Sequence, residues 1–321
     1  MTEWRPTATR ARLALRAALL AATRDFFESR GVLEVETPWL VNAGVTDVNL
    51  GSVTARLGDQ TLHLHTSPEY AMKRLLASGI GDIYQLCHVA RADERSRSHN
   101  PEFTLLEWYR CGFSMAALIK ETTALLDALL VRAGRGPRPL RELRYQQAFL
   151  DALGIDPLIA AHETLQTLAM AHGLATATAK SLDRDGLLDF LISAVIGPAL
   201  GRNEWLALTH YPASQAALAR LDDADPRVAL RFEIYAEGIE LANGFEELAS
   251  AAEQRVRFEA DNDLRETRGL PRIALDERLL AALESGLPAC AGVALGFDRA
   301  VMLASGAASI DDVIAFPTEM A

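Results

Sequence analysis

Two extended segments joined by a short polar connection are the feature that most constrains how this chain can fold. Residues 83–91 and 103–110 are rich in aliphatic and aromatic side chains and are bounded by turn-forming residues, as strands are. Because the connection between them is short, we expect the two strands to pair in antiparallel fashion. A second hairpin is predicted within residues 229–245, which turn near Glu237 and Gly238. These pairs predict a mainly antiparallel sheet.

Helical and extended segments are mixed along the rest of the chain without a repeating βαβ pattern. Residues 7–30 carry apolar side chains at helical spacing and end at Gly31, a predicted C-terminal cap. The other predicted elements are a strand-like run over 32–40, an extended run from 62 into a Ser-Pro turn, helices over 70–78 and 114–133, an Arg-rich loop over 132–144, helical segments to about residue 200, and a strand, glycine and helix over 292–306. This mixture predicts an α+β fold, with helices packed against an antiparallel sheet.

Composition and charge place the chain among ordinary globular proteins. Half of its 321 residues are apolar, and 32 basic against 43 acidic residues give a net charge of −11. This charge offers no general attraction for nucleic acid phosphates, although it counts only weakly against a tRNA ligand. Cys87, Cys111 and Cys290 form an odd, widely spaced set, which favours a reducing compartment. Arg16 and Arg24 interrupt the first apolar run, so we expect neither a signal peptide nor a membrane span and predict a cytoplasmic protein.

The alternation of side chains along residues 103–110 separates two faces of the predicted strand. One face carries Phe103, Leu105, Glu107 and Tyr109, and the other carries Thr104, Leu106 and Trp108 and is predicted core. In the preceding strand Cys87, Val89 and Arg91 share one parity. A face with guanidinium, aromatic and carboxylate groups suits a polar ligand that has an aromatic part. The alternative is an antiparallel sheet with one solvent-exposed face.

A second concentration of acidic residues lies in the predicted hairpin FEIYAEGIELANGFEEL. Across a tight hairpin Glu233 and Glu240 fall opposite or diagonal to each other, where two carboxylates repel unless something neutralises them. Magnesium with bound phosphates would do so. Simple alternation does not place Asn243 on the face of Glu240, so a bulge or bend near Gly244 is needed. A solvated hairpin with scattered acids is the alternative.

The segment GVALGFDR predicts a strand that breaks at Gly296 into a helix whose first turn carries Arg299. The free N–H groups of a helix N-terminus and a nearby guanidinium together suit an anion. A plain strand-to-helix turn would have the same pattern, so this segment alone does not decide between the two.

Taken together, these segments resemble the three signature motifs of class II aminoacyl-tRNA synthetases, most closely the catalytic domain of lysyl-tRNA synthetases. The first helix, Gly31 and VLEVETPWL resemble motif 1, which in that family forms the homodimer interface. Residues 84–109 resemble motif 2 and residues 292–303 resemble motif 3. TSPEY (66–70) and ELANGFEEL (240–248) are similar to the amino-acid pocket of the lysine branch.

The resemblance implies a site for ATP, Mg²⁺ and a diamino acid. Arg91 would hold the α-phosphate and Arg299 the outer phosphates, and these two are the implied catalytic residues. The implied ATP-binding residues are Arg91, Ala92, Asp93, His99, Asn100, Phe103, Glu240, Leu241, Gly296 and Arg299. The implied substrate-binding residues are Ser67, Pro68, Glu69, Glu107, Tyr109, Asn243, Glu247 and Ala294, and the implied Mg²⁺ ligands are Glu233 and Glu240.

One residue of motif 2 departs from the family. Where the family reads Arg-x-Glu, this chain reads Arg91-Ala92-Asp93, one methylene shorter. Asp93 could still reach the amine of adenine through water, or Glu94 could take that place. The adenine contact at this position is therefore the point where the resemblance is weakest.

The chain leaves no room for the anticodon-binding domain of lysyl-tRNA synthetases. An OB-fold needs well over about 50 residues, whereas only residues 1–30 and 300–321 flank the motifs. We therefore expect a single class II catalytic domain over residues 1–321 and no tRNA partner. The chain resembles the family of truncated synthetase paralogues that attach (R)-β-lysine to elongation factor P, including in HNPEFTLLEWY and YPASQAALA (211–219).

Motif 3 carries a second clue to the substrate. Lysyl-tRNA synthetases have glycine two residues before the final glycine, and this chain has Ala294. The added methyl removes room near the backbone of an α-amino acid, which would favour an amine shifted by one carbon. The resemblance thus implies (R)-β-lysine activated by ATP, elongation factor P as the acceptor, and a homodimer. Two alternatives are α-lysine activation with a tRNA or small-molecule acceptor, and a catalytically silent paralogue that regulates a partner.

Overall fold

The computed structural model describes residues 4–92 and 94–321, so the predicted adenine contact of Asp93 lies outside the described residues. The chain divides into two compact units. Unit 1 comprises Met1–Ser114, Ala124–Pro137 and Leu248–Ala321, and unit 2 comprises Met115–Thr123 and Arg138–Glu247. Within the described part of the chain, none of the helices is both long and apolar enough to span a bilayer. Among the described residues, Cys87, Cys111 and Cys290 form no disulfide.

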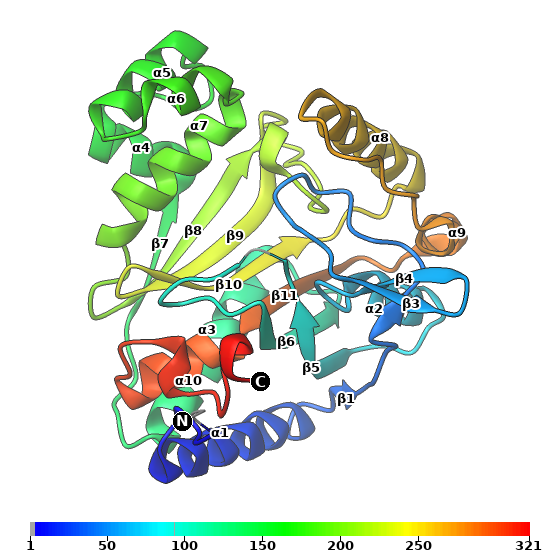
Figure 1. The fold of residues 1–321 in the computed structure, drawn as a ribbon, viewed down its shortest axis with the longest axis vertical. Coiled ribbons are helices and arrows are strands. Elements are labelled where there is room, and N and C mark those ends of the chain that lie inside the picture. Colours follow the sequence, from blue (N-terminus) through cyan, green and yellow to red (C-terminus); the bar gives the residue numbers. More distant parts are fainter. Residues whose placement is uncertain (1–3, 93) are drawn as a thin grey trace. The chain divides into compact units, whose positions relative to one another are not determined.

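In unit 1, four strands pair in the order β1-β5-β6-β11 (Figure 1). Their bounds are Leu33–Glu34, Ile83–Ala90, Glu102–Cys111 and Cys290–Gly296. The β5/β6 and β6/β11 pairs are antiparallel and β1/β5 is parallel. A separate three-stranded antiparallel sheet has the order β2-β4-β3, with bounds Leu40–Val41, Gln60–Leu64 and Thr54–Leu57. The antiparallel pairing expected of residues 83–91 and 103–110 is confirmed.

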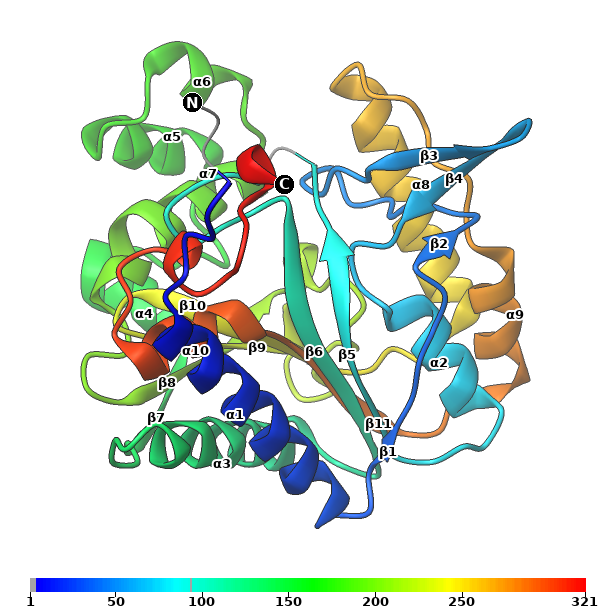
Figure 2. The same cartoon turned by 60° about the horizontal axis from the view of Figure 1, so that its bottom comes forward.

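Helices cover the sheet of unit 1. They are α1 (Arg10–Glu28), α2 (Glu69–Ala77), the second half of α3 (Met115–Arg132), α8 (Ala251–Thr267), α9 (Glu277–Gly286) and α10 (Phe297–Ser305). Thr9 caps α1 by accepting a hydrogen bond from the backbone N–H of Arg12 at 3.3 Å. Gly31 follows the helix with a φ of 67°, which glycine adopts without strain. Helix α1 runs beside α10 (Figure 2).

The core of unit 1 forms under the predicted apolar face of β6. Leu106 and Trp108 are fully buried. Phe27 of α1 stacks on Tyr84, with ring centroids 4.4 Å apart, and meets Trp108 edge-on at 5.3 Å. This packing fixes the orientation of β5 and β6, so their other face is available for polar groups.

The strand predicted over residues 32–40 is mostly wrong. Only Leu33–Glu34 and Leu40–Val41 pair with other strands, and these two pairs belong to different sheets. Trp39 and Leu40 remain exposed. The apolar side chains suggested a buried strand, but Pro38 lacks a backbone N–H and a long run of pairing through this segment is interrupted.

Unit 2 contains strands in the order β10-β9-β8-β7. Their bounds are Ile239–Glu246, Val228–Ala236, Trp205–Pro212 and Leu140–Arg144. The β9/β10 and β8/β9 pairs are antiparallel, and β7/β8 is parallel. The hairpin turns at Glu237 and Gly238, whose φ angles of 51° and 74° are both positive, as a type I′ turn requires. The predicted hairpin is therefore confirmed, but the loop predicted over 132–144 ends in strand β7.

Helices gather beside β7 and β8 in unit 2 (Figure 1). They are α4 (Tyr145–Leu153), α5 (His162–Ala171), α6 (Thr176–Ser181), α7 (Arg184–Leu191), a π-helical turn at Ile192–Ile196 and short 3-10 turns at Gly197–Ala199 and Ala213–Gln215. A cluster of buried residues that includes Phe149, Leu187 and Leu206 joins these helices to the strands. The helical character predicted up to about residue 200 is confirmed.

Candidate active site

Arg91 and Phe103 meet at the end of the β5/β6 pair. The register places Val89 opposite Phe103 and Cys87 opposite Leu105, so the two predicted polar faces are one face. Arg91 follows directly, and its guanidinium carbon lies 5.1 Å from the centre of the Phe103 ring. Its Nε donates to the carbonyl of Thr66 at 3.3 Å. A guanidinium beside an aromatic ring can bind a phosphate while the ring stacks on a base.

His99 and Arg299 are also brought together. Gly296 ends β11 as the N-cap of α10, and Arg299 Nη2 lies 2.5 Å from His99 Nε2. Burial and the charge of Arg299 both lower the pKa of His99. His99 Nε2 therefore accepts from the guanidinium, and Nδ1 carries the proton and donates to the Ser96 hydroxyl at 2.7 Å. An arginine and a neutral histidine at a helix N-terminus form a suitable site for an anionic group.

The side chain of Asn100 is engaged within the protein. Its Nδ2 donates to the carbonyl of Glu102 at 2.6 Å, and its Oδ1 accepts from the backbone N–H of Thr318 at 3.2 Å. The side chain is buried. A contact of Asn100 with adenine would therefore use its backbone. A polar contact of Ala92 would also use the backbone, because its side chain is apolar; its N–H donates to the carbonyl of Gly51.

A buried carboxylate organises a second polar cluster in unit 1. Glu107 Oε2 accepts from the Ser67 hydroxyl at 2.6 Å, and Oε1 accepts from the Tyr109 hydroxyl at 2.6 Å. Ala294 of β11 is the cross-strand partner of Glu107. The structure therefore brings together four of the residues implied to bind the substrate.

Helix α2 adds an ion pair whose two charges act on Glu107. Glu69, which follows Pro68 at the start of the helix, pairs with Lys73 at 2.7 Å. The Lys73 side chain is almost completely buried. Burying two charges is favourable only when they are paired, which fixes Glu69 in position. Spacing of i, i+4 on a helix could have identified Lys73 from the sequence, because Glu69 was already a candidate.

Burial, and to a lesser extent the charge of Glu69, raise the pKa of Glu107 to about 7. The hydrogen bonds from Ser67 and Tyr109 and the charge of Lys73 act in the opposite direction. Near neutral pH this carboxyl is therefore partly protonated, and a nearby positive charge would favour its ionised form.

This raised pKa predicts a pH dependence of stability. Between the ordinary value of 4.5 and about 7, folded Glu107 keeps a proton that the unfolded chain has lost. Its contribution to stability is therefore complete below pH 4.5 and declines as the pH rises to about 7. Glu107→Gln should remove this decline, measured as the free energy of urea unfolding at pH 5 and pH 8. Glu102→Gln, an exposed change on the same strand, should retain it; an unchanged slope in Glu107→Gln would contradict the assignment.

In unit 2 a β-bulge aligns the acidic residues of the hairpin. Glu233 pairs with Asn243 and Tyr235 pairs with Glu240, because the register shifts between Glu240 and Ala242. Glu233 and Glu240 are thus diagonal neighbours on one face, as predicted, and Asn243 joins them there. The bulge lies at Leu241 rather than near Gly244, where the sequence suggested it.

Arg231 neutralises Glu233 on this face. Arg231 Nη2 pairs with Glu233 Oε1 at 2.7 Å, and the Tyr235 hydroxyl donates to Oε2 at 2.8 Å. Arg231 Nε also donates to Asn243 Oδ1 at 3.3 Å. Sequence reasoning missed Arg231, although two-residue alternation places it on the face of Glu233.

These contacts decide how Mg²⁺ could fit. Each oxygen of Glu233 accepts one hydrogen bond and keeps lone pairs, and Glu240 lies diagonal to it. In residues 4–92 and 94–321, no group of three or more His, Cys, Asp or Glu side chains is suited to hold a metal. The two carboxylates therefore fit Mg²⁺ only as part of a shell completed by phosphate and water oxygens, as is usual for this ion. Glu247, at the end of the same hairpin, is buried and bridges to Ala219.

Asp298 is a residue of motif 3 that the sequence did not single out. It forms an ion pair with Arg16 of α1, and its Oδ2 accepts from the backbone N–H of Thr104 in β6 at 2.7 Å. Arg16 Nη2 also donates to the Thr104 hydroxyl at 2.7 Å. This buried carboxylate fixes the first turn of α10, and so the residue next to it, Arg299.

Comparison with known proteins agrees with this arrangement. Residues 1–320 match the family model of the class II tRNA synthetases (D, K and N). The chain belongs to this family, and the α+β fold with an antiparallel sheet is that of its synthetase domain.

Several curated relatives are similar over nearly their whole length. The chain is 48% identical to a protein of Avibacterium paragallinarum (99% of each chain), 49% identical to one of Klebsiella pneumoniae strain 342 (99% of this chain and 98% of the relative), and 50% identical to one of Vibrio cholerae serotype O1 (98% of each). Each of these relatives is named elongation factor P–(R)-β-lysine ligase.

Proposed function

We propose that this protein is an ATP-dependent ligase that activates (R)-β-lysine and transfers it to a lysine ε-amine of elongation factor P. The observation that carries the proposal is the identity of 48–50% over nearly the full length to relatives named for this activity. The two arginines proposed to bind phosphate, Arg91 and Arg299, lie beside Phe103 and His99 respectively. This supports an active enzyme over a silent paralogue.

In the first step a carboxylate oxygen of β-lysine attacks the α-phosphorus of ATP in line, and the bond to pyrophosphate breaks. The products are the β-lysyl adenylate and pyrophosphate. Arg91 would stabilise charge at the α-phosphate, and Arg299 with neutral His99 would hold the outer phosphates. Mg²⁺, when bound with the help of Glu233 and Glu240, would supply further neutralisation of phosphate charge. Positioning and electrostatics account for most of the catalysis.

In the second step the ε-amine of the acceptor lysine attacks the acyl carbon of the adenylate. An amide forms, AMP leaves and the amine releases a proton. The described residues offer no evident general base for this amine. A mixed anhydride is reactive enough to be attacked once the amine is positioned, so a base is unnecessary.

The substrate would bind through its two amines and its carboxylate. In unit 1 the proposed contacts to the amines are Glu69 and Glu107, with the Ser67 and Tyr109 hydroxyls beside Glu107. In unit 2 Asn243 and Glu247 are the proposed contacts. A pocket rich in carboxylates selects a diamino acid over an ordinary apolar amino acid, because buried carboxylates without ammonium partners are costly.

Ala294 is the proposed determinant of β-lysine over α-lysine. The support for this is that Ala294 is the cross-strand partner of Glu107, so the two side chains share a face. Ala294→Gly should raise the activation of α-lysine relative to (R)-β-lysine by about tenfold, since one methyl group in a pocket is worth about 1–3 kcal/mol. The measurement is kcat/KM for pyrophosphate exchange with each substrate. Ala291→Gly, on the same strand but on its other face, should leave the ratio unchanged; an unchanged ratio in Ala294→Gly would remove Ala294 from specificity.

Pyrophosphate exchange with α-lysine and with each β-lysine enantiomer tests the proposed reaction. We expect (R)-β-lysine to support the fastest exchange, and mass spectrometry to find one β-lysyl group on elongation factor P. Absence of exchange with every isomer would contradict an enzyme of this kind and favour a silent regulator. Efficient charging of tRNA would contradict the choice of acceptor.

We also propose a cytoplasmic homodimer with one catalytic domain and no tRNA partner. The exposed apolar side chains Leu33, Trp39 and Leu40, which are 54%, 44% and 40% exposed, support a subunit interface at motif 1. Sedimentation equilibrium of the purified protein would decide between one and two chains.

A further inference from the structure

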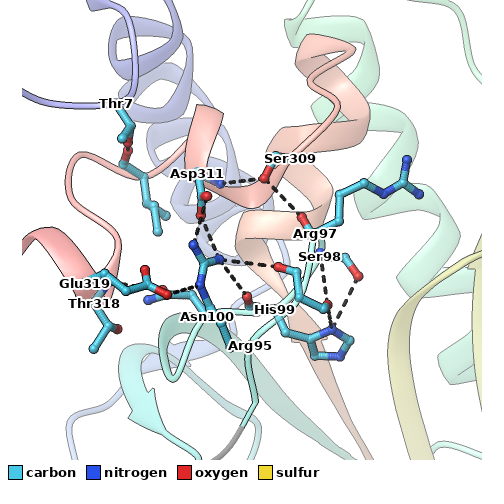
Figure 3. A network of polar contacts seen from close by, with 12 residues as sticks. Thr7, Arg95, Arg97, Ser98, His99, Asn100, Ser309, Asp311, Thr318 and Glu319 are labelled. Carbon is cyan, nitrogen blue, oxygen red and sulfur yellow. Dashed lines mark hydrogen bonds and ion pairs between the residues drawn. The ribbon is translucent and has the colours of Figure 1, made fainter.

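A single arginine connects the turn between β5 and β6 to the C-terminal part of unit 1. The β5–β6 turn is residues 94–100, and we call residues 309–319 the strap. Arg95 binds Asp311 with two parallel contacts, Nη1 to Oδ1 at 2.9 Å and Nη2 to Oδ2 at 3.0 Å. Its Nε binds Glu319 Oε1 at 2.6 Å (Figure 3). All three nitrogens of the planar guanidinium thus contact carboxylates of the strap.

The same guanidinium also fixes the shape of the turn. Arg95 Nη1 donates to the carbonyl oxygens of Ser96 at 3.4 Å and His99 at 3.3 Å. Ser96 and His99 form a bridge between the two sides of the turn. Arg95 therefore binds two carbonyl oxygens of the turn as well as two carboxylates of the strap.

Two backbone groups of the strap bind the turn as well. The N–H of Ile310 donates to the carbonyl of Arg97 at 2.9 Å, and the N–H of Thr318 donates to Asn100 Oδ1 at 3.2 Å. Figure 3 shows Ser309 of the strap in contact with Arg97 of the turn. The two segments are therefore joined at the middle of the turn and at its end.

The strap is itself held in place, so it can act as a support. Ile310 and Val313 are buried in unit 1. The N–H of Thr7 donates to the carbonyl of Ala315 at 3.0 Å, and Arg12 of α1 pairs with Asp312 at 3.0 Å. A segment anchored by two buried side chains and the start of α1 can restrain an adjacent polar turn.

We propose that Arg95 is a positioning residue for ATP, through which the strap holds the β5–β6 turn and His99 ready for the phosphates before the nucleotide arrives. This inference rests on the proposed function. A polar turn without such support would lose conformational freedom when ATP binds, and that loss would weaken binding. Arg95 itself touches no reacting group; it acts through His99, whose ring lies beside Arg299.

Arg95→Met tests the inference, because methionine keeps an unbranched stem and removes every ionic contact. We expect KM for ATP to rise about five- to tenfold. The reason is that the partly exposed ion pairs no longer order the turn, so the turn must become ordered when ATP binds. The values of kcat and of KM for (R)-β-lysine should change less than about twofold. Backbone amides of residues 95–100 should exchange hydrogen for deuterium faster in the nucleotide-free protein. Asp311→Asn should act in the same direction, and Asp311→Glu should restore part of the loss.

Arg272→Met is the matched control. Arg272 is an exposed arginine that also pairs with carboxylates, but its three partners, Glu259, Asp263 and Glu266, all belong to α8. If Arg95→Met matches Arg272→Met both in exchange at residues 95–100 and in KM for ATP, the inference is overturned. If the wild-type protein shows no pyrophosphate exchange with any lysine isomer, the proposed function fails instead. The role of Arg95 is then still decided by two measurements, the deuterium exchange of residues 95–100 and the dissociation constant for ATP.

Discussion

Replacing Arg299 by methionine should lower kcat for ATP–pyrophosphate exchange by about 10²–10³-fold, the usual loss when one donor to a developing negative charge is removed. The guanidinium is directed by its contacts with the Ser98 carbonyl at 3.2 Å and His99 Nε2 at 2.5 Å. In the variant, burial still lowers the pKa of His99, which disfavours its taking over the positive charge. Phosphate charge would then be held by fewer cationic groups in the transition state.

Arg299→Lys separates charge from geometry in this prediction. Lysine retains a positive charge but lacks the planar fork that binds His99 and a phosphate at once, so its rate should fall between those of the wild type and Arg299→Met. The melting temperature should be reported for each variant, since Arg299 also contacts Ser98. A rate for Arg299→Met within about threefold of the wild type would contradict a catalytic role.

Asp298→Ala should destabilise the protein by about 3–5 kcal/mol, the cost of breaking a buried pair by removing one partner. The change leaves the Arg16 guanidinium without its carboxylate and the backbone N–H of Thr104 without its acceptor. Both groups are largely shielded from water, so solvent cannot replace the lost contacts fully. Equilibrium unfolding in urea measures the difference, provided that the transition is two-state.

Two further variants sharpen this prediction. Arg16→Met combined with Asp298→Ala should cost less than the sum of the single changes, because the charge that the single change leaves unpaired is gone. Glu277→Gln removes an exposed pair with Arg255 and should change the free energy of unfolding far less. A loss for Asp298→Ala as small as that of Glu277→Gln would show that the contact is not important for stability.

The strand faces could be predicted from sequence because alternation is a local property of an extended backbone. Leu106 and Trp108 are buried as expected, and Glu107 and Tyr109 point together to the opposite face. The Glu237-Gly238 turn was also predictable, since glycine, here Gly238, adopts a positive φ without strain. The resemblance to synthetase motifs then supplied roles that local patterns alone left open.

Partners distant in the chain could not be predicted in this way. Residues 140–144 contain two arginines and were expected to form a loop. They form a strand instead, which pairs with β8 from Leu140 opposite Trp205 onward. Asp298 binds Arg16 and Thr104, and no spacing in the sequence links these positions. Tertiary pairing overrides local propensity in such segments.

The bulge at Leu241 has a consequence for how this hairpin can vary. A regular ladder would be the better strand pair, but it would turn Asn243 and Glu240 to opposite sides of the sheet. The extra residue shifts the alternation of side chains by one position. One strand pairing is lost, and both groups then share a face. For this hairpin the number of residues between Glu240 and Asn243 matters as much as their identities, and gain or loss of a single residue there would reverse what the sheet presents.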